Sequence, residues 1–317
     1  MNWIQKLRNF LPILGIIIFI YIFIDVGVDK IIDVLRKIPL TFLLISAFLS
    51  FPRIILSTYK WHIIAEKQEI YTNFLNLIKL NFIGLFYGTI TPLWLGDYIR
   101  IPYLKWESNK PLGRCASNVL IDQIIEFLAL FLLAAAGSFI LFSKYPHLLF
   151  ILLFFLLLFL FIVLFFKEKR RSKKIFSMIS SLLLPDRIKS LLTNEFEAFY
   201  SNIPSFSFLL LPLLIELISY TIFFSQIYLI AYSLNLSIPF FNFILIYPIA
   251  SLVGLIPITI SGFGTREGTL IMLFKPYGIE ENFAVALSLA GYFITMLIPA
   301  FVGAIVSFLY KPKAKLL

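Results

Sequence analysis

The chain has 317 residues, of which 60% are hydrophobic and 14% charged, and its mean hydropathy is +0.95. A soluble fold could not cover that much apolar surface, so the composition predicts an all-α polytopic membrane protein. The net charge of +10 comes from Lys and Arg residues between apolar runs, which is typical of membrane topology and lipid contact rather than of nucleic-acid binding. One cysteine and two separate histidines exclude a disulfide framework and a His/Cys metal cluster, and we expect no metal and no cofactor.

Six apolar stretches are long enough to cross a hydrocarbon core as helices of about 20 residues. They lie at 11–28, 39–59, 114–142, 147–166, 205–233 and 282–310. No small-x-small cleavage site follows the first stretch, so we predict an uncleaved helix there. Two further stretches, 73–104 and 239–275, are interrupted by Pro and Gly beside charges. They predict two broken, re-entrant helical hairpins.

The distribution of Lys and Arg predicts the orientation. If both hairpins enter and leave on one side, 18 Lys and Arg residues lie on the side of the termini, including Lys60 after the span 39–59, and 5 lie on the other side. This excess predicts a multi-pass protein of the cell membrane with both termini in the cytoplasm. The basic loop 167–204 would then be cytoplasmic, either as amphipathic helices on the inner leaflet or as an elbow that only fixes topology.

The order of a span, a broken hairpin and a second span occurs twice within the single domain 1–317, at about 39–142 and 205–310. Arg100 and Arg266, which follow the two breaks, are 166 residues apart. The halves would run in opposite directions across the membrane, which predicts an inverted repeat of the kind found in many transporters. A broken helix is tolerated at membrane depth only inside protein or around a wet cavity, and its free helix N-terminus favours an anion. The predicted backbone breaks lie at Pro92, Gly96, Pro257, Gly262 and Gly264.

Charged residues within the predicted membrane segments are candidate site residues, because each costs about 2.5–3.5 kcal/mol at the bilayer centre when it is exposed to lipid. We expect Arg100 and Arg266 to bind an anion alternately from the two sides, with Asp97 and Glu267 orienting them. Arg53 lies near the end of a predicted helix and is expected to snorkel to the interface. The other candidates could bind substrate or protons, or simply neutralise an arginine: Asp122, Glu126, Glu216 and Lys79.

Two sequence blocks carry a family resemblance. The first runs from Asn81 to Pro92 and continues with Gly96-Asp97 and Arg100; the second contains Pro248, Pro257, Gly262-Phe263-Gly264 and Arg266-Glu267-Gly268. Together they resemble the lysylphosphatidylglycerol synthase transmembrane-region family, over about residues 10 to 310. The resemblance implies a flippase-like domain. In the multiple peptide resistance factors this domain is fused to a cytosolic synthase that aminoacylates phosphatidylglycerol, whereas other members stand alone or are attached to glycosyltransferases that use polyprenyl carriers. Because the chain ends at Leu317, we expect a stand-alone member without the synthase domain.

The predicted function is translocation of an anionic-headgroup lipid between leaflets, such as an aminoacylated phospholipid or a polyprenyl-phosphate-linked lipid. The expected partner is a membrane lipid, with a separate lipid-modifying enzyme and an oligomer as further options and no nucleic acid. The alternative is a membrane-embedded transferase, or a partner subunit of a lipid-modifying synthase or glycosyltransferase. The sequence offers carboxylates but no nucleophile-base pair, which favours transport over catalysis.

Overall fold

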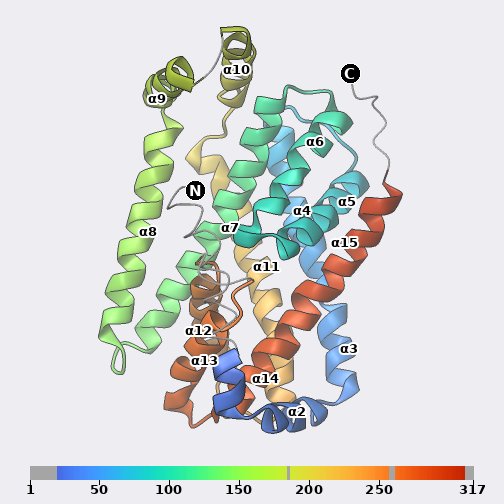
Figure 1. Cartoon of the computed structure of the whole chain (residues 1–317), viewed down its shortest axis with the longest axis vertical. Helices are drawn as coiled ribbons and strands as arrows, with labels where there is room; N and C mark the ends of the chain where they lie inside the picture. The colour runs from blue at the N-terminus through green and yellow to red at the C-terminus, as the bar shows by residue number, and fades with distance from the viewer. Residues whose placement is uncertain (1–19, 184–185, 257–260, 311–317) are drawn as a thin grey trace.

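The computed structural model describes residues 20–183, 186–256 and 261–310, and every regular element among them is a helix (Figure 1). The first half of the chain forms α2 (Val28–Arg36), α3 (Leu40–Phe48), α4 (Ser50–Lys67), α5 (Phe74–Ile90), η1 (Pro92–Ile99), α6 (Arg100–Ser108), α7 (Leu112–Ile140) and α8 (Pro146–Lys167). The second half forms α9 (Lys169–Leu183), α10 (Asp186–Phe199), α11 (Phe206–Ser233), α12 (Phe240–Gly254), α13 (Thr265–Phe274), η2 (Lys275–Tyr277), α14 (Glu281–Tyr292), η3 (Phe293–Leu297) and α15 (Ile298–Leu309).

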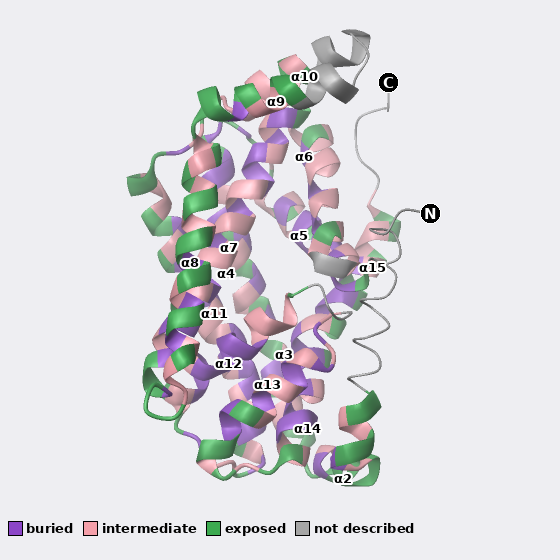
Figure 2. Ribbon diagram, turned by 60° about the vertical axis from the view of Figure 1, so that its left-hand side comes forward, coloured by how far each residue is buried: buried purple, intermediate pink, exposed green. Residues whose placement is uncertain are grey.

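Five helical stretches in the described part of the chain are long and apolar enough to cross a membrane: Leu40–Lys67, Leu112–Ile140, Pro146–Lys167, Phe206–Ser233 and Glu281–Leu309. The prediction of an all-α polytopic membrane protein is confirmed. The predicted first span, 11–28, lies largely outside the described residues. Figure 2 shows that α8 is exposed along much of its length, and large apolar side chains such as Phe150, Phe154 and Phe161 are more than 60% exposed there. A surface of this kind is suited to lipid rather than to water.

Both predicted breaks coincide with the ends of short apolar helices. The helix α5 ends at Ile90, where the next residue, Thr91, is extended, and the chain then passes through the 3₁₀ segment η1 before α6 begins at Arg100. The helix α12 ends at Gly254, and α13 begins after Gly264, whose φ of +88° is a conformation that glycine adopts without strain. Pro257 lies outside the described residues. Figure 1 shows α5 and α6 toward one end of the bundle and α12 and α13 toward the other.

Two close helix contacts connect the halves of the chain. A Cβ at Gly137 of α7 would overlap the carbonyl oxygen of Leu245 on α12, and a Cβ at Gly303 of α15 would overlap the carbonyl oxygen of Phe82 on α5. Small residues allow this approach of backbones, which is how helices associate in a membrane. As a result, α7 packs closely against α12, and α15 against α5.

The basic loop forms the helices α9 and α10 at the end of the bundle where α7 begins (Figure 1). Glu195 of α10 accepts a 2.6 Å hydrogen bond from the backbone N–H of Gly113, and Ser201 accepts one of 3.0 Å from Arg114 Nε. Between the two helices, hydrogen bonds from Lys169 and Lys173 hold the pKa of the Glu197 carboxyl below its ordinary value. The loop is therefore docked onto the bundle.

Candidate functional site

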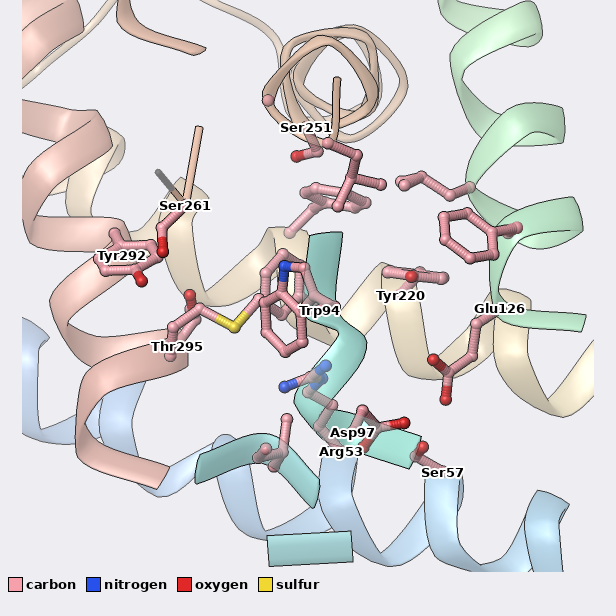
Figure 3. A pocket seen from close by; sticks show the side chains of 18 of the residues that line it. Arg53, Ser57, Trp94, Asp97, Glu126, Tyr220, Ser251, Ser261, Tyr292 and Thr295 are labelled. Atoms are coloured by element: carbon pink, nitrogen blue, oxygen red, sulfur yellow. The ribbon is translucent and has the colours of Figure 1, made fainter. Parts of the chain in front are cut away.

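A cavity of about 150 Å³, lined by apolar side chains together with charged and polar ones, lies between the two breaks. Trp94 and Asp97 line it from the first break, and Gly254 and Ser261 line it from the second. The breaks also contact each other, because Ser261 Oγ donates a 3.1 Å hydrogen bond to the carbonyl oxygen of Thr89. Figure 3 shows Trp94, Asp97, Ser261 and the surrounding polar side chains facing this space. The structure thus brings the two broken regions to one cavity.

Arg100 is held in an ion-paired network at one side of this cavity. Its Nη2 pairs with the carboxylate of Asp97, its Nη1 lies 2.9 Å from Asp122 Oδ2, and its guanidinium stacks 4.7 Å from the Trp61 ring centre. Only 2% of the Arg100 side chain is exposed. Gly84 makes room for the pair, because a Cβ there would overlap Asp97 Oδ1. Arg100 is therefore fixed and largely neutralised by carboxylates.

Lys60 is the centre of the same network. Its Nζ lies 2.8 Å from Asp122 Oδ1, 2.9 Å from Glu126 Oε1 and 3.0 Å from Glu216 Oε2, and its side chain is fully buried. The assignment of Lys60 to a cytoplasmic loop was wrong, because α4 continues to Lys67 and buries it. The signal in the sequence was that five carboxylates lie within the predicted membrane segments against four cations, so that one carboxylate lacked a cation.

Arg266 lies in the first turn of α13 and has different neighbours. Its Nη2 and Nε lie 2.9 and 3.2 Å from Glu267 Oε1, and Nε also donates a 2.7 Å hydrogen bond to Ser288 Oγ. The other oxygen of Glu267 accepts a 2.6 Å hydrogen bond from the backbone N–H of Gly264. The N-terminus of α13, which the sequence suggested as an anion site, therefore already receives a carboxylate of its own chain.

The last two cations occupy unexpected places. Arg53 lies in the first turn of α4, but this turn is inside the longer span Leu40–Lys67. There Arg53 lines the cavity with its guanidinium 4.5 Å from the Phe223 ring centre, so the snorkelling prediction was wrong. Lys79 lies outside the cavity on an exposed face of α5, with Nζ 3.4 Å from Asn76 Oδ1 and 5.7 Å from the Tyr310 ring. At the first break, Gly96 donates a 2.7 Å hydrogen bond to Thr91 Oγ1.

The chain is similar to known membrane proteins over most of its length. The family described as lysylphosphatidylglycerol synthase TM region matches residues 10–303. The UPF0104 membrane protein MJ1595 of Methanocaldococcus jannaschii is 24% identical over 96% of this chain and 93% of its own length. The UPF0104 membrane protein PH1989 of Pyrococcus horikoshii is 23% identical, over 94% of this chain and 96% of its own. A UPF0104 membrane protein of Methanothermobacter thermautotrophicus is 22% identical, over 95% and 92%.

Proposed function

The chain belongs to the lysylphosphatidylglycerol synthase TM region family, and from this premise we propose that it moves lipids with an anionic phosphate headgroup between the leaflets of a membrane. The observation that carries the proposal is the cavity lined by Arg53, Arg100 and Arg266 at the meeting point of the two breaks, inside a bundle of membrane-crossing helices. Charged groups along such a path lower the cost of taking a headgroup across the hydrocarbon core, while the lipid tails stay in the bilayer.

Internal symmetry supports the proposal. The offset of 166 residues that relates Arg100 to Arg266 also relates Gly88 to Gly254, Gly96 to Gly262 and Gly137 to Gly303. The last pair makes the two reciprocal helix contacts, from α7 to α12 and from α15 to α5. An inverted repeat with re-entrant hairpins accounts for both the sequence offset and the contacts, and such repeats can exchange conformations to open one cavity to either side.

The proposed orientation places the α9–α10 end in the cytoplasm of a cell-membrane protein, because the Lys and Arg residues outside the spans concentrate at that end. Labelling of Lys174→Cys by a membrane-impermeant thiol reagent checks it, since the exposed position 174 should react in inside-out vesicles and stay protected in right-side-out vesicles.

Reconstitution into liposomes tests the function. Fluorescently labelled phosphatidylglycerol placed in one leaflet should reach the other faster in proteoliposomes than in protein-free liposomes. Ser57 lines the cavity, so Ser57→Trp should fill it and reduce the rate at least tenfold. Ser143→Trp, in an exposed loop, adds the same ring elsewhere and should leave the rate unchanged. Equal rates for the wild type and protein-free liposomes, or for Ser57→Trp and the wild type, contradict the proposal.

A further inference from the structure

The three cavity-lining arginines differ in how far carboxylates neutralise them. Around Arg100, the described residues place one further cation, Lys60, and four carboxylates, those of Asp97, Asp122, Glu126 and Glu216. Two positive charges against four negative ones give this side of the cavity an excess of negative charge when all groups are ionised. A phosphate would be repelled there, even though it would lie next to an arginine.

Arg53 has the opposite surroundings. It makes no ion pair with any residue in the described ranges, and its buried Nη1 has no hydrogen-bond partner. A buried guanidinium donor that is left unsatisfied is costly, and such a group in a native protein calls for an explanation such as a ligand. Figure 3 shows the Arg53 side chain beneath Trp94, at the cavity. Arg53 thus offers a full positive charge and a free donor to whatever enters.

Arg266 also keeps a donor free. Glu267 and Ser288 occupy its Nη2 and Nε, whereas Nη1 has no hydrogen-bond partner among the residues that the structure describes. The guanidinium lies 4.8 Å from the ring centre of Tyr292, which lines the cavity as Arg266 itself does. One carboxylate and one arginine leave this side of the cavity without the negative excess found around Arg100.

The repeat offset explains this difference between the two sides. Shifting by 166 residues relates Asp122, the partner of Arg100, to Ser288, the partner of Arg266. The same shift relates Lys60 to Gln226 and Glu216 to Ser50, and Gln226 Nε2 donates a 2.8 Å hydrogen bond to Ser50 Oγ. The ion pairs Arg100–Asp122 and Lys60–Glu216 therefore have the counterparts Arg266–Ser288 and Gln226–Ser50, in which no carboxylate takes part. The carboxylates that neutralise Arg100 have no equivalent around Arg266.

We infer that Arg53 and Arg266 together form the phosphate-binding subsite of this cavity, and that Arg100 is a positioning residue that holds the carboxylates around Lys60. This inference rests on the proposed lipid translocation and replaces the alternation of Arg100 with Arg266 that the sequence suggested. Arginine suits the role because its planar group of donors can bind two phosphate oxygens at once. The phosphate of a lipid headgroup and free inorganic phosphate share this chemistry.

Ligand binding to the purified full-length protein in detergent tests the inference. The probes are dihexanoyl phosphatidylglycerol and inorganic phosphate, measured by calorimetry, with the melting temperature of each variant recorded beside the affinity. Arg53→Gln should weaken phosphatidylglycerol binding at least tenfold and leave the melting temperature unchanged, because no carboxylate loses its partner. Lys79→Gln removes the same charge outside the cavity and should bind as the wild type does.

Substitutions at Arg266 and Arg100 test whether one arginine binds phosphate and the other stabilises the charged network. Arg266→Gln should weaken binding at least tenfold, with Arg266→Lys intermediate because it keeps the charge and loses the paired donors. Arg100→Gln should lower the melting temperature and leave the affinity of the folded protein within about threefold. Wild-type affinity in Arg53→Gln, or loss of binding in an Arg100→Gln protein that melts like the wild type, overturns the inference.

The two probes show which part of the lipid is recognised, and the liposome assay distinguishes failure of the subsite from failure of the proposed function. Binding of both probes, with inorganic phosphate competing, shows that the phosphate alone is recognised, and binding of phosphatidylglycerol alone shows that the rest of the lipid contributes; both support the subsite. Failure of the wild type to bind either probe overturns it.

If phosphatidylglycerol binds in an Arg53-dependent way but liposomes show no lipid movement, the subsite stands and the proposed function fails. If lipid moves equally in the wild type and Arg53→Gln, the function stands and the subsite fails.

Discussion

At the scale of single residues, Lys60 determines how the charged network is built. Its ammonium group lies between 2.8 and 3.0 Å from three carboxylates and donates a hydrogen bond to Glu126 Oε1. Burying one charge without partners costs several kcal/mol, and burying three carboxylates side by side would add their repulsion. The network is therefore stable only as a unit, and removal of the central cation affects every member.

Replacing Lys60 should expose this dependence. Lys60→Gln leaves Asp122, Glu126 and Glu216 without their shared cation and should lower the free energy of unfolding by about 3–5 kcal/mol, the usual cost of breaking a buried pair. The measurement is thermal unfolding in detergent, with Lys79→Gln as the control at an exposed position. Equal melting temperatures for the two variants would contradict the prediction.

The offset of 166 residues suggests a second substitution that should restore part of the stability lost in Lys60→Gln. Gln226 and Ser50 are the offset counterparts of Lys60 and Glu216, and they make a neutral hydrogen bond. The double variant Lys60→Gln with Glu216→Ser should therefore regain part of the lost stability. A double variant that is less stable than Lys60→Gln alone would show that Glu216 has another stabilising partner.

At the scale of helices, the contacts between the halves depend on two glycines. The backbones of α7 and α12 touch at Gly137, and those of α15 and α5 touch at Gly303. Adding a methyl group at either place forces the helices apart, because the neighbour is a backbone carbonyl rather than a movable side chain. The adjustment cannot be local, since each helix pair joins one half of the chain to the other.

Alanine substitutions test these contacts. Gly137→Ala and Gly303→Ala should each destabilise the protein by about 1–3 kcal/mol through overpacking, as measured by thermal unfolding in detergent. Gly268→Ala is the matched control, because the nearest atom to its Cβ, Ile22 Cδ1, would be at an ordinary 3.6 Å and the helix α13 would gain a better helix former. If Gly137→Ala melts no lower than Gly268→Ala, the contact with α12 is not tight.

The sequence predicted the lengths of most spans because hydropathy records how much apolar chain is needed to cross a bilayer. Four of the observed crossing helices begin and end within two residues of the predictions. The predicted span 39–59 ends eight residues before the observed helix, which continues to Lys67. Its last turns contain Trp61, Ile64 and Ala65, which are buried by neighbouring helices and not by lipid. Hydropathy alone does not identify a polar helix end that is buried by other helices.

The candidate site was only partly predictable for a related reason. Local spacing identified Asp97 and Arg100 as neighbours on one turn, and Arg266 and Glu267 as adjacent residues. The partners of Asp122, Glu126 and Glu216 depend on where α4, α7 and α11 face one another, which no local pattern encodes. The sequence could not place Arg53 in the cavity or Lys79 outside it, because a charge at a given depth can point to lipid, to a neighbour or to a cavity.

At the scale of the whole molecule, the two breaks touch each other at the cavity. Ser261, which lines the cavity, donates a hydrogen bond to the carbonyl oxygen of Thr89 near the end of α5. If lipid headgroups pass between the hairpins, the breaks must separate in each cycle of transport. This movement would be one of the rearrangements by which an inverted repeat opens alternately to the two sides.

A covalent link between the breaks should stop this movement. In a background of Cys115→Ser, the pair Thr89→Cys and Ser261→Cys joined by a short, reducible thiol crosslinker should reduce lipid translocation in liposomes at least tenfold, and reduction should restore it. The control pair, Asn76→Cys with Glu107→Cys, lies within the first hairpin, where the native side chains are 2.7 Å apart, and its link should leave transport unchanged. Full transport with the 89–261 link in place would mean that headgroups cross without separation of the hairpins, whereas inhibition by the control link would place the essential movement within the first hairpin.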